Sequence, residues 1–135
     1  MNLLGRTKIV PSIVPTAGAI GTATATVIDC AGFDRVCHVI AIGAAGGAST
    51  FDYKVQESAA SGGTYSDVAD ADLTQVAATG ASKVYAIDVP VNSAKPYQKA
   101  VASVGTATFA NAAVAVLYEG SGTYPKTAAT EAIII

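Results

Sequence analysis

The sequence predicts an all-β fold, an antiparallel β-sandwich or barrel of the jelly-roll type with extended N- and C-terminal arms. Apolar stretches rich in Val, Ile, Phe, Thr and Tyr recur at intervals of roughly 10 to 20 residues, joined by Gly, Ser and Asn turns. No stretch of 12 or more residues shows a convincing helical period. The expected organisation is an arm over residues 1–21, one domain over 22–120 and a tail over 121–135.

The first 42 residues favour extended structure throughout. Residues 1–21 are broken by Pro11 and Pro15, which cannot donate ladder hydrogen bonds, so this segment is expected to be an arm or an edge strand. Residues 22–30, TATATVIDC, alternate and predict a strand. Residues 33–42, FDRVCHVIAI, form the strongest strand. Its second half is apolar on both faces, which is typical of a central strand or an interface strand.

The middle of the chain contains the clearest alternation. In Thr50–Gln56, residues Phe51, Tyr53 and Val55 point to one side and polar residues to the other. Residues 69–80 are expected to hold a short helical turn capped by Asp72.

Three further strands are expected in the last third of the domain. Residues 82–91 place Tyr85, Ile87 and Val89 on a core face, and residues 96–104 form the next strand. Residues 107–119 are apolar on both faces, and their alanines also allow a helix. A strand is favoured because Val, Phe, Thr and Tyr dominate the rest and a Gly-Thr turn precedes it.

These patterns predict a common core. The residues expected to be largely buried are Val36, Val39, Ile40, Phe51, Tyr53, Val55, Tyr85, Ile87, Val114 and Val116.

The composition points to a protein whose surface is covered by partners. Charged residues make up 13% of the chain, against a typical ~25%. A plain Ala-rich domain is the alternative. The net charge is −2 and the eight basic residues are dispersed, which argues against nucleic-acid binding. No apolar run is long enough for a membrane span, and the first residues lack a signal-peptide pattern, so synthesis in a cytosol is expected.

The cysteines are expected to be reduced, structural thiols. Cys30 and Cys37 flank AGFDRV, and buried thiols behave as small hydrophobic groups. A disulfide between adjacent strands is the alternative. Zinc would require further ligands at a different spacing. No cofactor is expected.

No residue pattern supports an enzyme. His38 is the only histidine, and its neighbour Cys37 would point to the opposite face of a strand, so a hydrogen-bonded or interface role is expected. Asp67, Asp70 and Asp72 resemble a loose cation loop but lack the spacing of an EF-hand, so solvated turn carboxylates are favoured.

The apolar ends of the chain are candidate interface segments, because burying each isoleucine is worth ~1.5–3 kcal/mol. The tail could form an edge strand of its own domain or dock on a neighbouring subunit. The interface candidates are Leu3, Leu4, Ile9, Ile13, Tyr118, Tyr124, Ile133, Ile134 and Ile135.

Four segments within residues 22–120 resemble small tailed-phage virion proteins of the head decoration (cement) type. The matching segments are TATVIDCAGFDRVCHVIAIGA, FDYKVQESAASGGTYSDVADADLT, KVYAIDV and KPYQKAVASVGTATFANAAVAVLYEG. Gly62-Gly63 stands where the family usually has Asp-Gly. The resemblance implies a β-rich protein without active-site residues, made in the host cytoplasm. It also implies a homotrimer on the capsid surface that binds the major capsid protein.

Other roles remain open on the sequence alone. One is a different virion part, such as a head–tail joining, tail or fibre-base protein. Another is a receptor- or carbohydrate-binding sandwich, which would favour exposed Trp or clustered aromatics. The chain has no Trp and its tyrosines are scattered.

Overall fold

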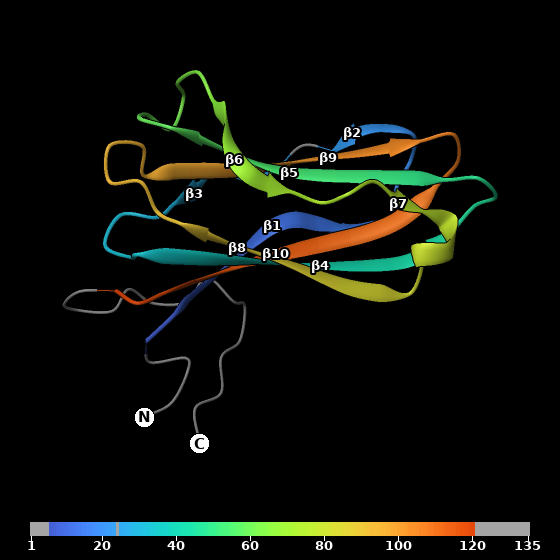
Figure 1. Ribbon diagram of the computed structural model, residues 1–135, viewed down its shortest axis with the longest axis horizontal. Helices are drawn as coiled ribbons and strands as arrows, with labels where there is room; N and C mark the ends of the chain where they lie inside the picture. Colours follow the sequence, from blue (N-terminus) through green and yellow to red (C-terminus); the bar gives the residue numbers. More distant parts are fainter. Residues whose placement is uncertain (1–5, 24, 121–135) are drawn as a thin grey trace.

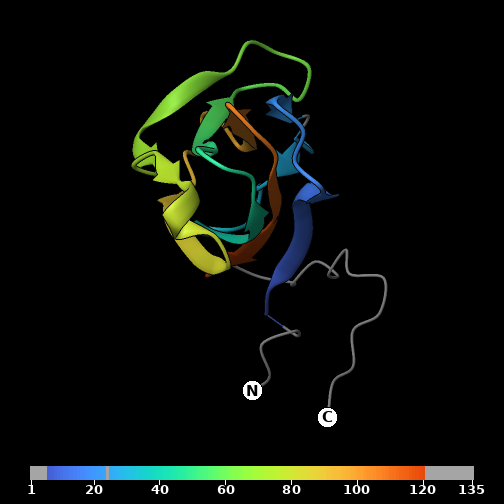
Figure 2. The same ribbon diagram turned by 90° about the vertical axis from the view of Figure 1, so that its right-hand side faces the viewer.

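The computed structural model, which describes residues 6–23 and 25–120, is a β-sandwich. Two antiparallel sheets lie face to face (Figure 1), and the view along the strands shows the two layers end-on (Figure 2). The predicted all-β sandwich is confirmed.

Each sheet joins strands that are distant in sequence. The four-stranded sheet has the order β1 (Lys8–Thr16), β10 (Phe109–Tyr118), β4 (Arg35–Ala45) and β8 (Lys83–Pro90). The six-stranded sheet is built on β2 (Gly21–Ala23), β9 (Tyr97–Gly105), β5 (Thr50–Ser58) and β6 (Ser66–Asp72), with β3 (Ile28–Asp29) on β9 and β7 (Val76–Ala77) on β5.

The core is formed by the inner faces of the two sheets. Phe51 and Phe109 come from opposite sheets, are fully buried and have ring centroids 5.9 Å apart. Five predicted core residues are buried: Val36, Ile40, Phe51, Tyr53 and Val55. Tyr85 and Ile87 are half-buried and pack against the same cluster.

The prediction was wrong for Val39, Val114 and Val116. Side chains alternate along a strand, and the inner positions of β4 are Val36, Ile40 and residues in phase with them. Val39 therefore lies on the outer face, beside Val114 of β10, which is 38% exposed. A continuous apolar run does not reveal whether its odd-numbered or its even-numbered residues face the core.

The N-terminal segment forms an edge strand from residue 8 onward, which confirms one of the two expected alternatives and excludes an arm for residues 8–16. Lys8–Thr16 forms β1, which pairs with β10 at the edge of the four-stranded sheet. The sandwich therefore begins before residue 22, the expected boundary. Pro11 and Pro15 are tolerated because an edge strand leaves one side without ladder partners. Residues 1–5 and 121–135 lie outside the described residues.

Two local predictions need correction. Residues 22–30 form two short strands, β2 and β3, instead of one. Residues 69–80 do hold a short helical turn, the 3-10 turn η1 (Ala78–Gly80), but only at the end of the range, because residues 69–72 belong to β6 and Val76–Ala77 to β7. Asp72 ends β6 and caps no helix, because η1 has Ala77 at its N-cap and no side-chain cap.

The turn between β1 and β2 depends on a glycine. Gly18 is buried with φ of 71°, and its carbonyl accepts a 2.9 Å hydrogen bond from the backbone N–H of Phe109. A Cβ at this position would overlap the carbonyl of Phe109. Gly18 thus allows two backbone segments to touch.

We expect Gly18→Ala to lower the free energy of unfolding by more than about 2 kcal/mol, because it combines left-handed strain with the overlap on Phe109. Gly47→Ala is the matched control, since its added methyl meets no atom within 4 Å. It should stay within about 0.5 kcal/mol of wild type. Urea unfolding measures both, and equal losses would contradict this account of the turn.

Candidate interaction surface

The outer face of the four-stranded sheet is almost wholly apolar. Because alternate residues of each strand point outward, one row of neighbours across all four strands is Pro11, Val114, Val39 and Ala86. We call this surface the apolar face. It consists of Ile9, Pro11, Cys37, Val39, Ala41, Val84, Ala86, Ala112, Val114 and Val116.

Part of the apolar face is exposed in the described part of the chain, and the rest, including Cys37, Val39 and Val116, is half-buried. Val84 is 68% exposed and Val114 38% exposed. At one end, Pro15, Ala41, Gly43 and Ala112 help to line a shallow depression of about 300 Å³. A continuous exposed apolar patch on a folded domain usually marks a contact surface.

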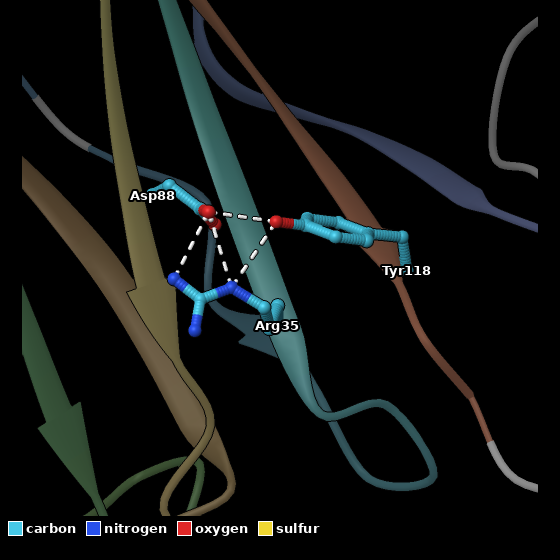
Figure 3. Close-up of polar contacts among 3 residues, drawn as sticks. All are labelled: Arg35, Asp88 and Tyr118. Atoms are coloured by element: carbon cyan, nitrogen blue, oxygen red, sulfur yellow. Dashed lines mark hydrogen bonds and ion pairs between the residues drawn. The ribbon is translucent and has the colours of Figure 1, made fainter.

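A polar cluster closes the other end of the apolar face (Figure 3). Arg35 on β4 forms an ion pair with Asp88 on β8, with Nη2 2.9 Å from Oδ2. The hydroxyl of Tyr118 on β10 donates to the same carboxylate oxygen at 2.7 Å and accepts from Arg35 Nε at 3.1 Å. The hydrogen bond to Asp88 raises the pKa of Tyr118. All three side chains are thereby tied to one another.

The outer face of the six-stranded sheet has the opposite character. Lys54 of β5 pairs with Asp67 of β6 at 2.8 Å, and Gln75 donates to the carboxylate of Asp52. Lys99 lies 4.2 Å from the centre of the Tyr65 ring. This face is therefore covered by charged and polar groups that water solvates well.

A second, buried polar cluster lies between the two sheets. His38 is completely buried, with Nδ1 3.0 Å from the hydroxyl of Tyr53 and Nε2 3.3 Å from Oε1 of Gln98. Ser12 Oγ lies 3.3 Å from the same hydroxyl. An amide oxygen only accepts, so the proton of the neutral ring is on Nε2, and Tyr53 donates to Nδ1.

Burial governs the protonation of this cluster. Desolvation lowers the pKa of His38 below its ordinary value of 6.5, and the hydrogen bond to Gln98 opposes this only in part. Desolvation likewise raises the pKa of Tyr53 to about 12. Since these groups are sealed from solvent, they stabilise the core as a neutral hydrogen-bonded network and are not placed to meet a substrate.

Both cysteines are free thiols, as predicted. Cys30 is fully buried, and desolvation raises its pKa to about 12. Cys37 is only half-buried on the apolar face, opposite Val116 and Asp88. Desolvation, followed by the charge of Asp88, raises its pKa. Cys37 is thus partly accessible, unlike the buried thiol that was expected.

The three aspartates do not form a site together. Asp67 accepts hydrogen bonds from Lys54 and Gln56, and the bond to Lys54 is the main cause of its lowered pKa. Asp70 and Asp72 are exposed near the end of β6. Within residues 6–23 and 25–120, no group of three or more His, Cys, Asp or Glu side chains is arranged to hold a metal ion.

The predicted interface residues divide into three groups. Ile9 and Tyr118 lie on the outer side of the four-stranded sheet, at or beside the apolar face. Ile13 was misplaced by the prediction, because it is 2% exposed and belongs to the core. The rest lie outside the described residues: Leu3, Leu4, Tyr124, Ile133, Ile134 and Ile135.

The prediction missed most of the apolar face, including Val84, Ala86 and Val114. A signal was present, since residues 33–42 and 107–119 are apolar on both faces. Such strands need cover on both sides, and within residues 6–23 and 25–120 the only sheet packed on the four-stranded sheet lies on its inner side. Among the described residues, no helix has the length and hydropathy required to cross a membrane.

Comparisons with known proteins establish the fold but no family. No family model matches the sequence, and no curated protein matches it. The chain is similar to a chain in the structure of infectious bursal disease virus, Gx strain, with a TM-score of 0.56 and 11% identity. The alignment covers 89% of this chain and 34% of the viral one, so this chain spans about a third of that protein.

Two weaker similarities have TM-scores below 0.5 and do not establish a shared fold. One is to a chain from Bacillus endospore appendages, described as disulfide-linked pili, with a TM-score of 0.44, 13% identity and coverage of 90% and 96%. The other is to the Israel acute paralysis virus pentamer, with a TM-score of 0.37, 9% identity and coverage of 98% and 80%.

The buried histidine predicts a pH-dependent stability. A lowered pKa in the folded state means that His38 binds a proton more tightly in the unfolded chain. The contribution of the neutral His38 to the free energy of unfolding is therefore fully present well above pH 6.5 and decreases as the pH falls below that value. We expect unfolding in urea to become easier from about pH 7.5 to about pH 5. The dependence should be smaller in His38→Gln, even though that variant is less stable at every pH. An unchanged slope in the variant would contradict this assignment.

The cysteines should differ in reactivity and in energetic cost. In dilute protein, a maleimide reagent should modify Cys37 while Cys30 reacts only on unfolding, because Cys30 is fully buried. Cys30→Ala should cost ~1–3 kcal/mol of stability, and Cys37→Ala less than about 1 kcal/mol. Peptide mass spectrometry and thermal unfolding measure these effects. Equal labelling of both thiols in the folded protein would contradict the placement of Cys30.

Proposed function

We propose that this protein is a structural component of a virion that binds the outer surface of the capsid and cements neighbouring major capsid subunits. The apolar face is the main support for a structural role, because an exposed apolar sheet surface usually forms a contact with another protein. The fold similarity to a chain of a virus structure and the resemblance to decoration proteins support the virion setting.

The described residues also favour binding over chemistry. The histidine is sealed in the core, the aspartate Asp67 is paired with Lys54, and the exposed Arg35 is tied to Asp88 and Tyr118. We therefore propose a non-enzymatic protein without a cofactor. Its dispersed basic residues and net charge of −2 do not suit a nucleic-acid partner.

A cement protein acts by adding buried interface between shell subunits. A rigid sandwich provides a fixed shape, and apolar segments outside the described residues, such as Leu3-Leu4 and Ile133–Ile135, add contact area. The proposed partners are the major capsid protein and further copies of this chain. The proposed location is the capsid surface, after synthesis in the host cytoplasm.

Cross-linking mass spectrometry on assembled particles tests the proposed role. The expected result is cross-links from Lys8 or Lys83, on the edge strands of the four-stranded sheet, to two different major capsid subunits. We also expect stripped particles to release their DNA at a lower temperature than particles to which the purified protein has been restored. Cross-links confined to tail or joining proteins would instead assign the chain to another virion part. Absence from purified particles would overturn the virion role itself.

A further inference from the structure

Asn111 is a polar residue on the otherwise apolar inner side of β10, and it is 5% exposed. The sheet is irregular on both sides of this residue. The ladder to β4 shifts register between Phe109 and Asn111, and the ladder to β1 shifts between Ile13 and Thr16, the partner of Asn111. Such bulges redirect side chains and are frequent beside functional sites. Asn111 therefore lies where the strands are shaped around one side chain.

The contacts of Asn111 account for only half of its amide group. Nδ2 donates a 2.8 Å hydrogen bond to the backbone carbonyl of Phe109. This bond fixes the orientation of the amide, because exchanging its nitrogen and oxygen would set two acceptors against each other. Oδ1 is buried and has no hydrogen-bond partner among the described residues. Since buried acceptors in folded proteins are normally paired, the oxygen of Asn111 is the group that a ligand can use.

Asn111 lines a pocket of about 190 Å³ at the end of the sandwich where the chain passes from β1 to β2. This connection crosses from the four-stranded to the six-stranded sheet (Figure 1). Gly18 and Val104 are buried residues of the pocket wall, and Ile20, 63% exposed, is an apolar residue at its surface. Because the side chain of Asn111 lies on the inner side of β10, the pocket is separate from the apolar face.

We infer that this pocket, called here the Asn111 pocket, binds a small uncharged alcohol or phenol whose hydroxyl donates to Oδ1 of Asn111. None of the described residues that line it is charged, so an ion would be desolvated there without a counter-charge. Ala19, Ile20, Ala23 and Val104 supply apolar surface for the body of the ligand.

The volume of the Asn111 pocket limits the size of the ligand. Sites for drug-sized molecules have ~300–1,000 Å³, so this one fits a fragment-sized molecule or a single side chain. The hydroxyl can therefore come from a free small molecule or from a tyrosine of another protein chain. The inference does not depend on the proposed virion role, and its test uses the purified full-length chain alone.

Titration with phenol, followed by NMR of the amide groups, tests the inference. Anisole is the matched ligand, because it has the same ring and an oxygen but no hydrogen-bond donor. This pair of ligands is cleaner than a change at Asn111, since losing that side chain also leaves the Phe109 carbonyl without its donor.

Phenol is expected to shift the backbone signals of Gly18, Thr22 and Val104 and the side-chain amide signals of Asn111. The shifts should saturate with a dissociation constant on the order of 1 mM, as expected for a ligand of few atoms. Anisole should bind at least about tenfold more weakly, because it leaves Oδ1 unpaired. Equal affinities for the two ligands overturn the inference, as does the lack of a saturable shift at these residues up to about 20 mM phenol.

A change in the pocket wall provides an independent test. Ala23 lines the pocket and packs against the core from β2, so Ala23→Leu extends into the space between the sheets. It should weaken phenol binding at least about tenfold. Ala17→Leu is the matched control and should bind like wild type, because Ala17 is exposed and does not line the pocket. Thermal unfolding establishes that both are folded. A folded Ala23→Leu that binds phenol as wild type does overturns the inference.

N-acetyl-tyrosinamide distinguishes the two sources of the hydroxyl. If it produces the same shifts as phenol with at least the same affinity, the pocket admits a tyrosine side chain with its backbone attached, and a partner protein is the source. If phenol binds and N-acetyl-tyrosinamide does not, the ligand is a free small molecule. Both results support a hydroxyl ligand at Asn111.

Discussion

The pairing of β4 with β10 on one side and β8 on the other determines most of the structure. Val39 is the partner of both Val114 and Ala86, and His38 is the partner of both Ala115 and Ile87. Because neighbouring residues in a strand point to opposite faces, this single register sends His38 into the core and Val39 outward. Every later feature, from the buried network to the apolar face, depends on that parity.

The buried polar network gives the register its specificity. A slip of one residue would place Cys37 or Val39 where Val36 or Ile40 lies, so at these positions hydrophobicity alone distinguishes the two registers weakly. It would also carry His38 away from Tyr53 and Gln98, leaving their buried polar groups without these partners. Unpaired buried groups cost ~1–3 kcal/mol each. The polar interior therefore helps to hold in one register a sheet whose two faces are similarly hydrophobic.

The sequence predicted best where polarity alternates. Phe51, Tyr53 and Val55 were correctly assigned to the core because the residues between them are polar, and Tyr85 and Ile87 followed the same rule. Residues 107–119 were correctly predicted to form a strand. Because these residues are apolar on both faces, the pattern did not show which of them point inward, and Val114 was wrongly assigned to the core. Ile13 was predicted to be an interface residue because a segment interrupted by prolines resembles an arm. Instead, this segment pairs with β10 and Ile13 lies in the core.

The few charged residues of the chain are unevenly distributed over its surface. Ion pairs such as Lys54–Asp67 gather on the six-stranded sheet, whereas Arg35 and Asp88 pair at one end of the four-stranded sheet, whose other charged residues, Lys8 and Lys83, lie on its two edge strands. These exposed pairs add little stability, so their distribution concerns solvation and contact rather than folding. The composition indicated that part of the surface is covered. The distribution of charges indicates that the covered part of the surface is the outer face of the four-stranded sheet. This sheet has apolar residues on both faces, which suits a layer that lies inside an assembly.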